Sequence, residues 1–364
     1  MKFGFVLFML LPVLAHVYVL WHVYQVLPLP VWGKWTIVAL MTAALVMMFV
    51  GLFGTFDRMP LGLASAAYDV STSWLIVFLY LLIAFVLLDL GRLVHLVPKT
   101  WLHDNAWTAG AVTAVIAGLL VYGNIHYHNK VRQPLTLGTS KQVSKPVRVM
   151  LLSDLHLGYH NRKAEWQRWV DMINTEQPDL ILVAGDIIDG YVRPLNDEDM
   201  AADFHQLKAP VVACLGNHEY ITGIDRSLDF YRRAGITLLR DSTLTVGDLL
   251  IVGRDDRSNR HRKSTAQLLA GADRSKFIIL LDHQPYHLEE SQQCGVDFQF
   301  SGHTHEGQVW PISLIVHSMY EDAWGFCQKG DTRYYVSSGM GIWGGKYRIG
   351  TRSEYVIATI ESSF

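Results

Sequence analysis

The stretch VRVMLLSDLHLG (residues 147–158) decides the fold of the C-terminal part of this chain. Its first six residues are mostly apolar, as in a strand that is buried on both faces of a parallel sheet. Asp154 and His156 follow this strand two positions apart, and in extended backbone such residues point the same way. We therefore expect a carboxylate and an imidazole side by side at the carboxyl edge of a sheet, where open α/β sheets bind ligands.

Four later apolar runs end in the same way, and each delivers side chains that can bind a metal. They are LILVAGD (residues 180–186), VVACLGNHE (211–219), FIILLDHQP (277–285) and FQFSGHTH (298–305). Each motif alone has an ordinary explanation, because a Gly-Asp pair is commonly a turn and a histidine is commonly a core residue. Five in succession, each closing a strand, indicate one site. Carboxylate, amide and imidazole ligands without a thiolate suit Mn, Fe or Zn.

These five motifs, in this order, resemble those of the calcineurin-like metallophosphoesterase superfamily. The segment SGHTHEGQ (residues 301–308) resembles its membrane-associated or exported bacterial branch, which includes the YkuE and YaeI proteins. The tail segments 337–341 and 348–354 are also similar to that branch. Glu306 departs from it, because the branch commonly has glycine there, and adds a negative charge beside the motif.

The resemblance implies a site with two divalent metal ions and a bridging hydroxide that attacks phosphorus. It implies three ligands to the first metal: Asp154, His156 and His305. It implies three ligands to the second metal: Asn217, His283 and His303. Asp186 would bridge both metals, and His218 would remain free of metal as the general acid. Glu219 could orient His218 or could equally be an exposed carboxylate.

Three further residues are candidates for substrate binding. His160 follows the first motif and could contact substrate, although an ordinary loop role is open as well. Arg254 and Arg348 could each clamp a phosphate, since a guanidinium matches the geometry of phosphate oxygens. His287, four residues after His283, is a reserve ligand.

The first 128 residues have the composition of a membrane region. Apolar runs cover Phe3–Leu29, Trp35–Phe56, Trp74–Leu88 and Trp107–Ile125. A membrane-spanning helix needs about 20 apolar residues, so we expect about four helices in residues 1–128. Tryptophans near the predicted ends suit the membrane interface. Within the third run's extension, Asp89 and Arg92 can pair on one helix face.

Residues 129–146 are polar and predict a linker, and residues 147–364 predict the metallophosphoesterase domain. Apolar runs in that domain predict strands over 147–152, 180–184, 211–215, 249–252, 277–281, 297–300, 334–337 and 355–360. Helical spacing predicts helices over 163–175 and 199–207. This alternation indicates layered α/β packing, and the resemblance implies a β-sandwich flanked by helices.

Composition limits the function classes. The 364 residues carry a net charge of -2, so the whole chain shows no basic footprint for nucleic acid. Cys214, Cys294 and Cys327 form no metal-binding or redox motif. The leading hypothesis is a membrane-anchored, metal-dependent phosphoesterase that hydrolyses phosphomonoesters or phosphodiesters, with a lipid-linked or cell-envelope phosphate as a plausible substrate.

Two alternatives remain open. A nuclease or protein phosphatase of the same superfamily is one, although GDIIDG (residues 185–190) lacks the arginine that protein phosphatases carry after this motif. A non-catalytic membrane receptor is the other, and the complete ligand set argues against it. We expect an integral, multi-pass protein of a bacterial cell membrane. The positive-inside count mildly favours a cytoplasmic domain, whereas the resemblance favours the outside, which we expect. The sequence indicates no oligomeric state.

Overall fold

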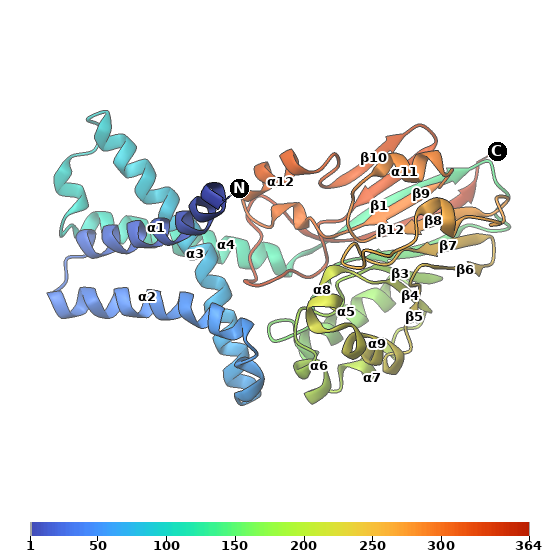
Figure 1. Ribbon diagram of the computed structural model, residues 1–364, viewed down its shortest axis with the longest axis horizontal. Coiled ribbons are helices and arrows are strands. Elements are labelled where there is room, and N and C mark those ends of the chain that lie inside the picture. The colour runs from blue at the N-terminus through green and yellow to red at the C-terminus, as the bar shows by residue number, and fades with distance from the viewer. Residues whose placement is uncertain (1, 364) are drawn as a thin grey trace. The chain divides into compact units, whose positions relative to one another are not determined.

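The computed structural model describes the backbone of residues 2–363 and the side chains of residues 11–51 and 53–363. The chain divides into two compact units, of which the first reaches to Asn124 and the second begins at Ile125 (Figure 1). The long helices of residues 2–128 are α1 (Lys2–Val26), α2 (Val31–Leu52), α3 (Leu61–Leu93) and α4 (Ala106–His128). Two short 3-10 helices, η1 (Phe56–Arg58) and η2 (Lys99–Leu102), lie between them.

Within the described residues, three helices are long and apolar enough to cross a membrane: Val31–Gly51, Leu61–Leu93 and Ala106–His128. The described apolar part of α1, Leu11–Val26, is shorter. The expected first span lies partly outside the described side chains and stays a prediction. Asp89 does not pair with Arg92 as expected. It accepts a hydrogen bond from the hydroxyl of Tyr18 at 2.8 Å, and its Oδ2 lies 3.1 Å from Nε2 of His22.

Helix α3 begins well before the expected third run, at Leu61 instead of Trp74. Its added turns are rich in polar and small residues, which lowered the apolar signal. Ser71 and Thr72 satisfy their hydroxyls within the helix, because both donate to the main-chain oxygen of Tyr68. The helix is 33 residues long, which exceeds the roughly 20 residues that a membrane span needs.

The second unit contains two six-stranded sheets in its described residues. The first sheet has, in spatial order, β1 (Lys130–Thr139), β12 (Ser353–Ser362), β2 (Val147–Leu152), β3 (Leu180–Ala184), β4 (Val211–Cys214) and β5 (Thr237–Leu238). The second has β10 (Gly325–Lys329), β11 (Thr332–Val336), β9 (Phe298–Ser301), β8 (Phe277–Leu281), β7 (Leu249–Gly253) and β6 (Ser242–Val246). Strands β2 to β5 run parallel, as do β7, β8, β9 and β11.

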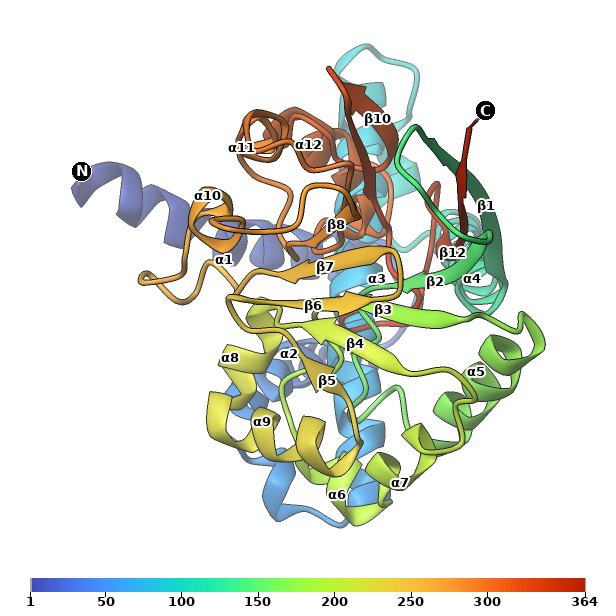
Figure 2. The ribbon, with the colours of Figure 1, turned by 90° about the vertical axis from the view of Figure 1, so that its right-hand side faces the viewer.

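Helices cover the outer face of each sheet (Figure 2). On the first sheet they are α5 (Lys163–Thr175), α6 (Arg193–Asp197), α7 (Met200–Phe204), α8 (Asn217–Thr222) and α9 (Ile224–Arg233). On the second they are α10 (Thr265–Leu268), α11 (Leu288–Gln293) and α12 (Ile312–Met319). Side chains alternate along each inner strand: Ile181 and Val183 of β3 pack with the helices, whereas Leu180 and Leu182 pack between the sheets. The expected layered α/β sandwich flanked by helices is confirmed.

The linker expected over residues 129–146 is wrong for most of its length, because residues 130–139 form strand β1. This strand pairs in parallel with β12 from Lys130↔Ser353 to Thr139↔Ser362. The polar composition suits a strand at the edge of a sheet, where Pro134 is tolerated and alternate side chains face solvent. Leu137 of β1 is nevertheless fully buried between the sheets. A single residue, Asn129, therefore separates the end of α4 from the start of the sheet.

Candidate metal centre

The motif residues lie in loops that follow the carboxyl ends of β2, β3, β4, β8 and β9. Five of them adopt the left-handed backbone region, with positive φ: Asp154, His156, Asp186, His303 and His305. This conformation is strained for residues with a side chain and is concentrated at functional sites. The expectation of extended backbone at Asp154 and His156 is therefore wrong. The two side chains still converge, because main-chain bonds fix both residues to the loop after β3: Asp154 N to Gly185 O and His156 N to Asp186 O, 3.1 and 3.0 Å.

Two glycines allow these loops to approach each other. A Cβ on Gly216 would lie 2.1 Å from Oδ1 of Asp186, and a Cβ on Gly302 would lie 2.2 Å from Oδ2 of Asp154. Both distances are far below van der Waals contact. The glycines that precede Asn217 and His303 are thus required to bring carboxylates of the first two motifs against the later ones.

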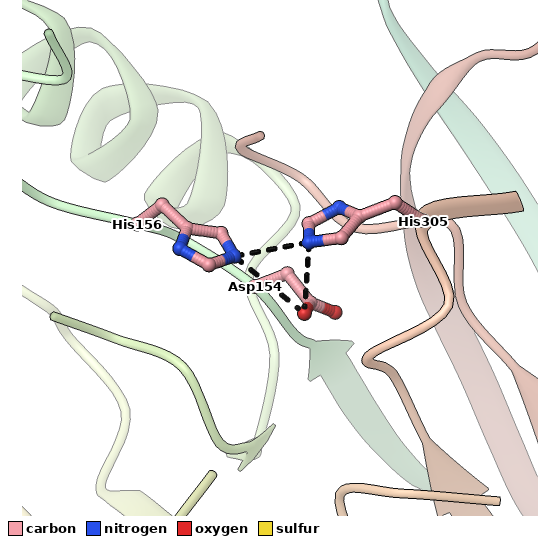
Figure 3. Close-up of side chains that lie close together, drawn as sticks. All are labelled: Asp154, His156 and His305. Carbon is pink, nitrogen blue, oxygen red and sulfur yellow. Dashed lines mark hydrogen bonds and ion pairs between the residues drawn. The ribbon is translucent and has the colours of Figure 1, made fainter. Parts of the chain in front are cut away.

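Asp154, His156 and His305 form the first group of possible ligands (Figure 3). Their side chains point toward one another, and all three residues are buried. Oδ1 of Asp154 lies 3.4 Å from Nε2 of His305 and 3.8 Å from Nε2 of His156. The two Nε2 atoms are 3.0 Å apart. These are the three residues that the sequence predicted for the first metal.

Asp186, His283 and His303 form a second group, and Asn217 lies within it. Nε2 of His283 lies 3.1 Å from Oδ2 of Asp186 and 3.2 Å from Oδ1 of Asn217. Nδ1 of His303 lies 2.8 Å from the same Asn217 oxygen. Oδ2 of Asp186 is also 3.7 Å from Nε2 of His156 in the first group. Asp186 therefore lies between the two groups, as expected of a bridging carboxylate.

The carboxylates of the cluster are held in their ionised form, whereas its imidazoles differ in protonation. Burial alone would raise the pKa of Asp186, but His283 and His218 outweigh it and hold that pKa well below its usual range. Burial likewise opposes ionisation of Asp154, yet nearby His305 and His156 leave its pKa lowered. Burial lowers the pKa of His303 to about 4 and that of His305 well below its usual range. Burial also opposes a charge on His156 and His283, but the carboxylates beside them raise both pKa values, that of His156 to about 10. A bound cation would therefore have to displace protons from His156 and His283.

The donor set also fits divalent cations. Nε2 of His156 and Nε2 of His305 lie 3.0 Å apart beside one oxygen of Asp154, and a cation among these atoms would take the place of the proton that the two nitrogens can share. The atoms of each group lie within 4.8 Å of one another. Amide and carboxylate oxygens with imidazole nitrogens, and no cysteine, suit Mn, Fe or Zn.

Asp189 is a site residue that the sequence reasoning missed. It is buried, and its carboxylate Oδ1 accepts a hydrogen bond from Nδ1 of His156 at 3.1 Å. Its main-chain oxygen accepts one from Nδ1 of His218. His156, Asp189 and His218 also form a third group of possible ligands. The signal was present in GDIIDG, where a second carboxylate follows Asp186 by three residues.

The interpretation of Glu219 needs correction. This residue is fully buried and does not orient His218. Its carboxylate accepts from the main-chain nitrogens of Gly216, Asp186 and Ile188, at 2.7, 3.1 and 3.1 Å. Burial and the charge of Asp186 raise the pKa of Glu219 to about 7. Glu219 therefore fixes the loops that carry Asp186 and Asn217 together.

Asn217 and His218 are neighbours in the first turn of α8. Consecutive residues of a helix are about 100° apart around its axis, which separates their side chains. The main-chain nitrogen of His218 donates to Oδ1 of Asp186 at 2.9 Å, and its ring meets that of His156 edge-on at 4.5 Å.

The three candidates for substrate binding are engaged inside the domain. Arg254 is buried, and its guanidinium binds Asp282 and Glu290 at 3.2 and 2.8 Å. Arg348 is fully buried and donates to the main-chain oxygens of His305 and Gly341 at 2.7 and 3.2 Å.

His160 is buried as well, and its Nε2 donates to the main-chain oxygen of Ile342 at 2.6 Å. The contacts of His160, Arg254 and Arg348 support loops around the site. Because their polar groups are engaged in this way, none of the three side chains is placed to bind a phosphate in this structure. The reserve ligand His287 is exposed and lies near Glu289, 3.3 Å away. Glu306 is buried beside His305, and desolvation raises its pKa to about 7.

Comparison with known proteins agrees with this geometry. The family described as calcineurin-like phosphoesterase matches residues 147–307. An uncharacterized metallophosphoesterase of Campylobacter jejuni is 30% identical over 263 residues, which cover 68% of each chain. The zebrafish (Danio rerio) protein named transmembrane protein with metallophosphoesterase domain is 28% identical over 355 residues, covering 88% of this chain and 79% of its own.

The likeness extends to the branch that the sequence motifs indicated. The metallophosphoesterase YkuE of Bacillus subtilis is 27% identical over 277 residues, covering 70% of this chain and 96% of its own. Among solved structures, a 5'-nucleotidase precursor from Thermus thermophilus aligns with a TM-score of 0.33 and 18% identity. That alignment covers 44% of this chain and 42% of the nucleotidase, so this chain spans less than half of that protein.

Proposed function

Because this chain belongs to the calcineurin-like metallophosphoesterase family, and is thus a metal-dependent phosphoester hydrolase, we propose that it hydrolyses phosphomonoesters or phosphodiesters with two divalent cations while anchored in a membrane. Asp154, His156 and His305 hold the first cation in this proposal. Asn217, His283 and His303 hold the second. Asp186 is shared between them, and His218 is the general acid.

One observation carries the proposal. Side chains from five separate loops converge at one edge of the sandwich, and Asp186 lies 3.1 Å from His283 of one group and 3.7 Å from His156 of the other. A carboxylate shared between two groups of ligands allows two cations to lie close together despite their repulsion. Two cations held there would activate a water molecule near neutral pH and offset the charge on the phosphoryl oxygens.

Asp189 orients two histidines of the site, His156 and His218. Asp189 receives a hydrogen bond from Nδ1 of His156, which turns Nε2 of that ring toward Asp154. The main-chain oxygen of Asp189 holds Nδ1 of His218, and this leaves Nε2 of His218 for the leaving oxygen. The His218 side chain is partly exposed, at 13%, so a substrate can reach it. A proton delivered from Nε2 lets the alcohol depart as a neutral molecule.

Membrane association is supported by the three candidate spans and by relatives named as transmembrane proteins. We infer a multi-pass protein of the cell membrane, with the catalytic domain on its outer side. Phosphate esters of lipids or of the cell envelope would then be within reach. Protease treatment of sealed cells tests the side: cleavage of the domain by external protease is expected, and protection until the cells are opened would reverse the assignment.

The ligand assignment is tested by counting metals in purified full-length variants. Asp186→Asn is expected to lose metal from both sites, because its carboxylate serves both groups. Asn217→Ala is expected to lose mainly one metal, because its amide lies only in the second group. Elemental analysis after loading with Mn gives the counts, and hydrolysis of a nitrophenyl phosphate panel gives the activity. Equal metal loss in both variants would contradict the partition.

A further inference from the structure

Exposed large apolar side chains of the second unit are concentrated around one helix. In the described residues 125–363 they are Ile125, Ile221, Trp310, Leu314, Ile315, Met319, Phe326 and Trp343. Half of these lie in the ten residues from Trp310 to Met319, at the start of α12 and along it. Single exposed apolar residues are normal on a soluble surface, but a cluster of this kind marks an interaction site.

Leu314, Ile315 and Met319 lie on the same side of α12. They are 60, 54 and 63% exposed, whereas Ser313 on the other side is buried. Residues separated by one, four or five positions lie on one face of a helix. Leu314, Ile315, Ser318 and Met319 therefore form one continuous surface. The sequence of α12, ISLIVHSM, contains no Asp, Glu, Lys or Arg. Trp310, 49% exposed, precedes the helix. We call this set, Trp310, Leu314, Ile315 and Met319, the α12 face.

The α12 face is connected at both ends to the metal centre. The 3-10 helix η3 (His305–Gly307), which contains a proposed ligand, packs so closely on α12 that a Cβ on Gly307 would lie 2.6 Å from the main-chain nitrogen of Ser313. After the helix, the ring of Tyr320 lies 6.3 Å from that of His303. Tyr320 also meets Tyr286 through their hydroxyls, 3.1 Å apart. Whatever the α12 face contacts is therefore close to the proposed metal centre.

The chain itself supplies a reason to name the partner. It contains three candidate membrane spans, and only Asn129 separates the last of these helices from strand β1 of the catalytic unit. The catalytic unit therefore remains beside a bilayer. Exposed aliphatic side chains along one face of a helix, with a tryptophan before its first turn, are what an interfacial helix presents to a membrane.

We propose that the α12 face inserts into the surface of the bilayer that anchors the chain and presents the metal centre to phosphate esters of lipids. The substrate class rests on the proposed phosphoesterase function, whereas the insertion does not. The apolar side chains of the face leave water for the acyl region, and the headgroup phosphate of a neighbouring lipid lies at the level of the metal site. Soluble phosphate esters reach the same centre without using the α12 face.

Insertion is tested by photocrosslinking in the full-length protein. The chain is reconstituted in vesicles of phosphatidylcholine and phosphatidylglycerol, with p-benzoylphenylalanine placed at position 315. A lipid adduct at this position, detected by mass spectrometry, is the expected result. Position 40, exposed in α2, is the positive control, and position 229, on α9, is the negative control. Adducts at 315 with a second copy of the chain or with its own helices, or no adduct while position 40 reacts, would overturn the proposal.

The substrate class is tested with the pair of substitutions Leu314→Ser and Ile315→Ser, at two exposed residues that are not proposed ligands. Hydrolysis of phosphatidic acid in the same vesicles is expected to fall about tenfold or more, because the serine variants lose the free energy of transferring two apolar side chains from water into the bilayer. Hydrolysis of nitrophenyl phosphate is expected to stay unchanged. An equal fall for both substrates would mean damage to the site. A wild-type protein active only on the soluble ester would refute the lipid substrate, and inactivity on both would refute the phosphoesterase proposal itself.

Discussion

His218→Ala separates metal binding from proton transfer. In the structure the His218 ring is fixed from one side, since Nδ1 donates to the main-chain oxygen of Asp189, and it meets the His156 ring edge-on. The main-chain nitrogen of His218, which binds Asp186, is unchanged by the substitution. We therefore expect Asp186 and both metal groups to keep their arrangement. The loss should be confined to what the imidazole does for the leaving oxygen.

The size of that loss follows from the leaving group. General-acid assistance is worth about 10²–10⁴-fold in rate, so hydrolysis of an alkyl phosphate ester should fall within that range. A nitrophenolate departs without a proton, so hydrolysis of the nitrophenyl ester should fall far less. The assay compares kcat for the two esters in wild-type protein and His218→Ala, each loaded with Mn and checked for metal content.

Two results would refute this reasoning. Metal loss in His218→Ala would mean that the group His156, Asp189 and His218 binds a cation, which makes His218 a ligand. An equal fall for both esters would mean that His218 acts on the phosphoryl oxygens throughout the reaction instead of on the leaving group. His218→Asn, which keeps a hydrogen-bond donor without acid function, distinguishes this second case, because it would restore activity only if the role is phosphoryl stabilisation.

Two further predictions concern stability. A chain that starts at Ile125 should fold, whereas one that starts at Ser144 should melt at a clearly lower temperature or aggregate, because it lacks β1 and leaves β12 as an open edge; equal melting curves would show that β1 is dispensable. Glu176→Gln should lower the free energy of unfolding of the second unit by about 1–2 kcal/mol at neutral pH. This value allows for the partial exposure of Arg132 and Arg148, because solvent weakens their ion pairs with Glu176. Burial opposes the charge of Glu176, but Arg132, Tyr355 and Arg148 bind it and lower its pKa, so this stability is present above the ordinary value of 4.5 and is lost as the pH falls below it. Denaturant midpoints at pH 7 and in acid check this, and a difference that persists in acid would contradict it.

The inner strands could be predicted from the sequence, whereas the edge strands could not. Strands β2, β3 and β8 and helix α5 have the predicted bounds, because continuous apolar runs and helical spacing report burial directly. The missed strands β1, β6 and β10 lie at sheet edges, where alternate residues are exposed and the apolar signal is weak. Strand β5, the fourth omission, has only two residues.

The candidate site shows a similar division. Residue types and their positions at strand ends predicted that Asp154, Asp186 and His283 would meet, because parallel strands deliver their carboxyl ends to one edge. The positive φ values were not predictable, since they depend on how separate loops fix one another. The roles of Glu219 and Arg348 were missed for the same reason. Both are polar in sequence and fully buried in the fold, and their partners are main-chain atoms of other loops.

The segment between β11 and β12 explains how the first metal group is held. The main-chain nitrogens of Met340 and Gly341 donate to the oxygens of Ser153 and Asp154, at 3.1 and 2.9 Å. Further along the same segment, Arg348 donates to the oxygen of His305. One stretch of chain thus fixes two of the three proposed ligands, although neither is near it in sequence. The segment leads directly into β12, which lies between β2, the strand before Asp154, and β1, the strand after α4. The strand that follows the last candidate span is therefore part of the same sheet that positions the first metal group.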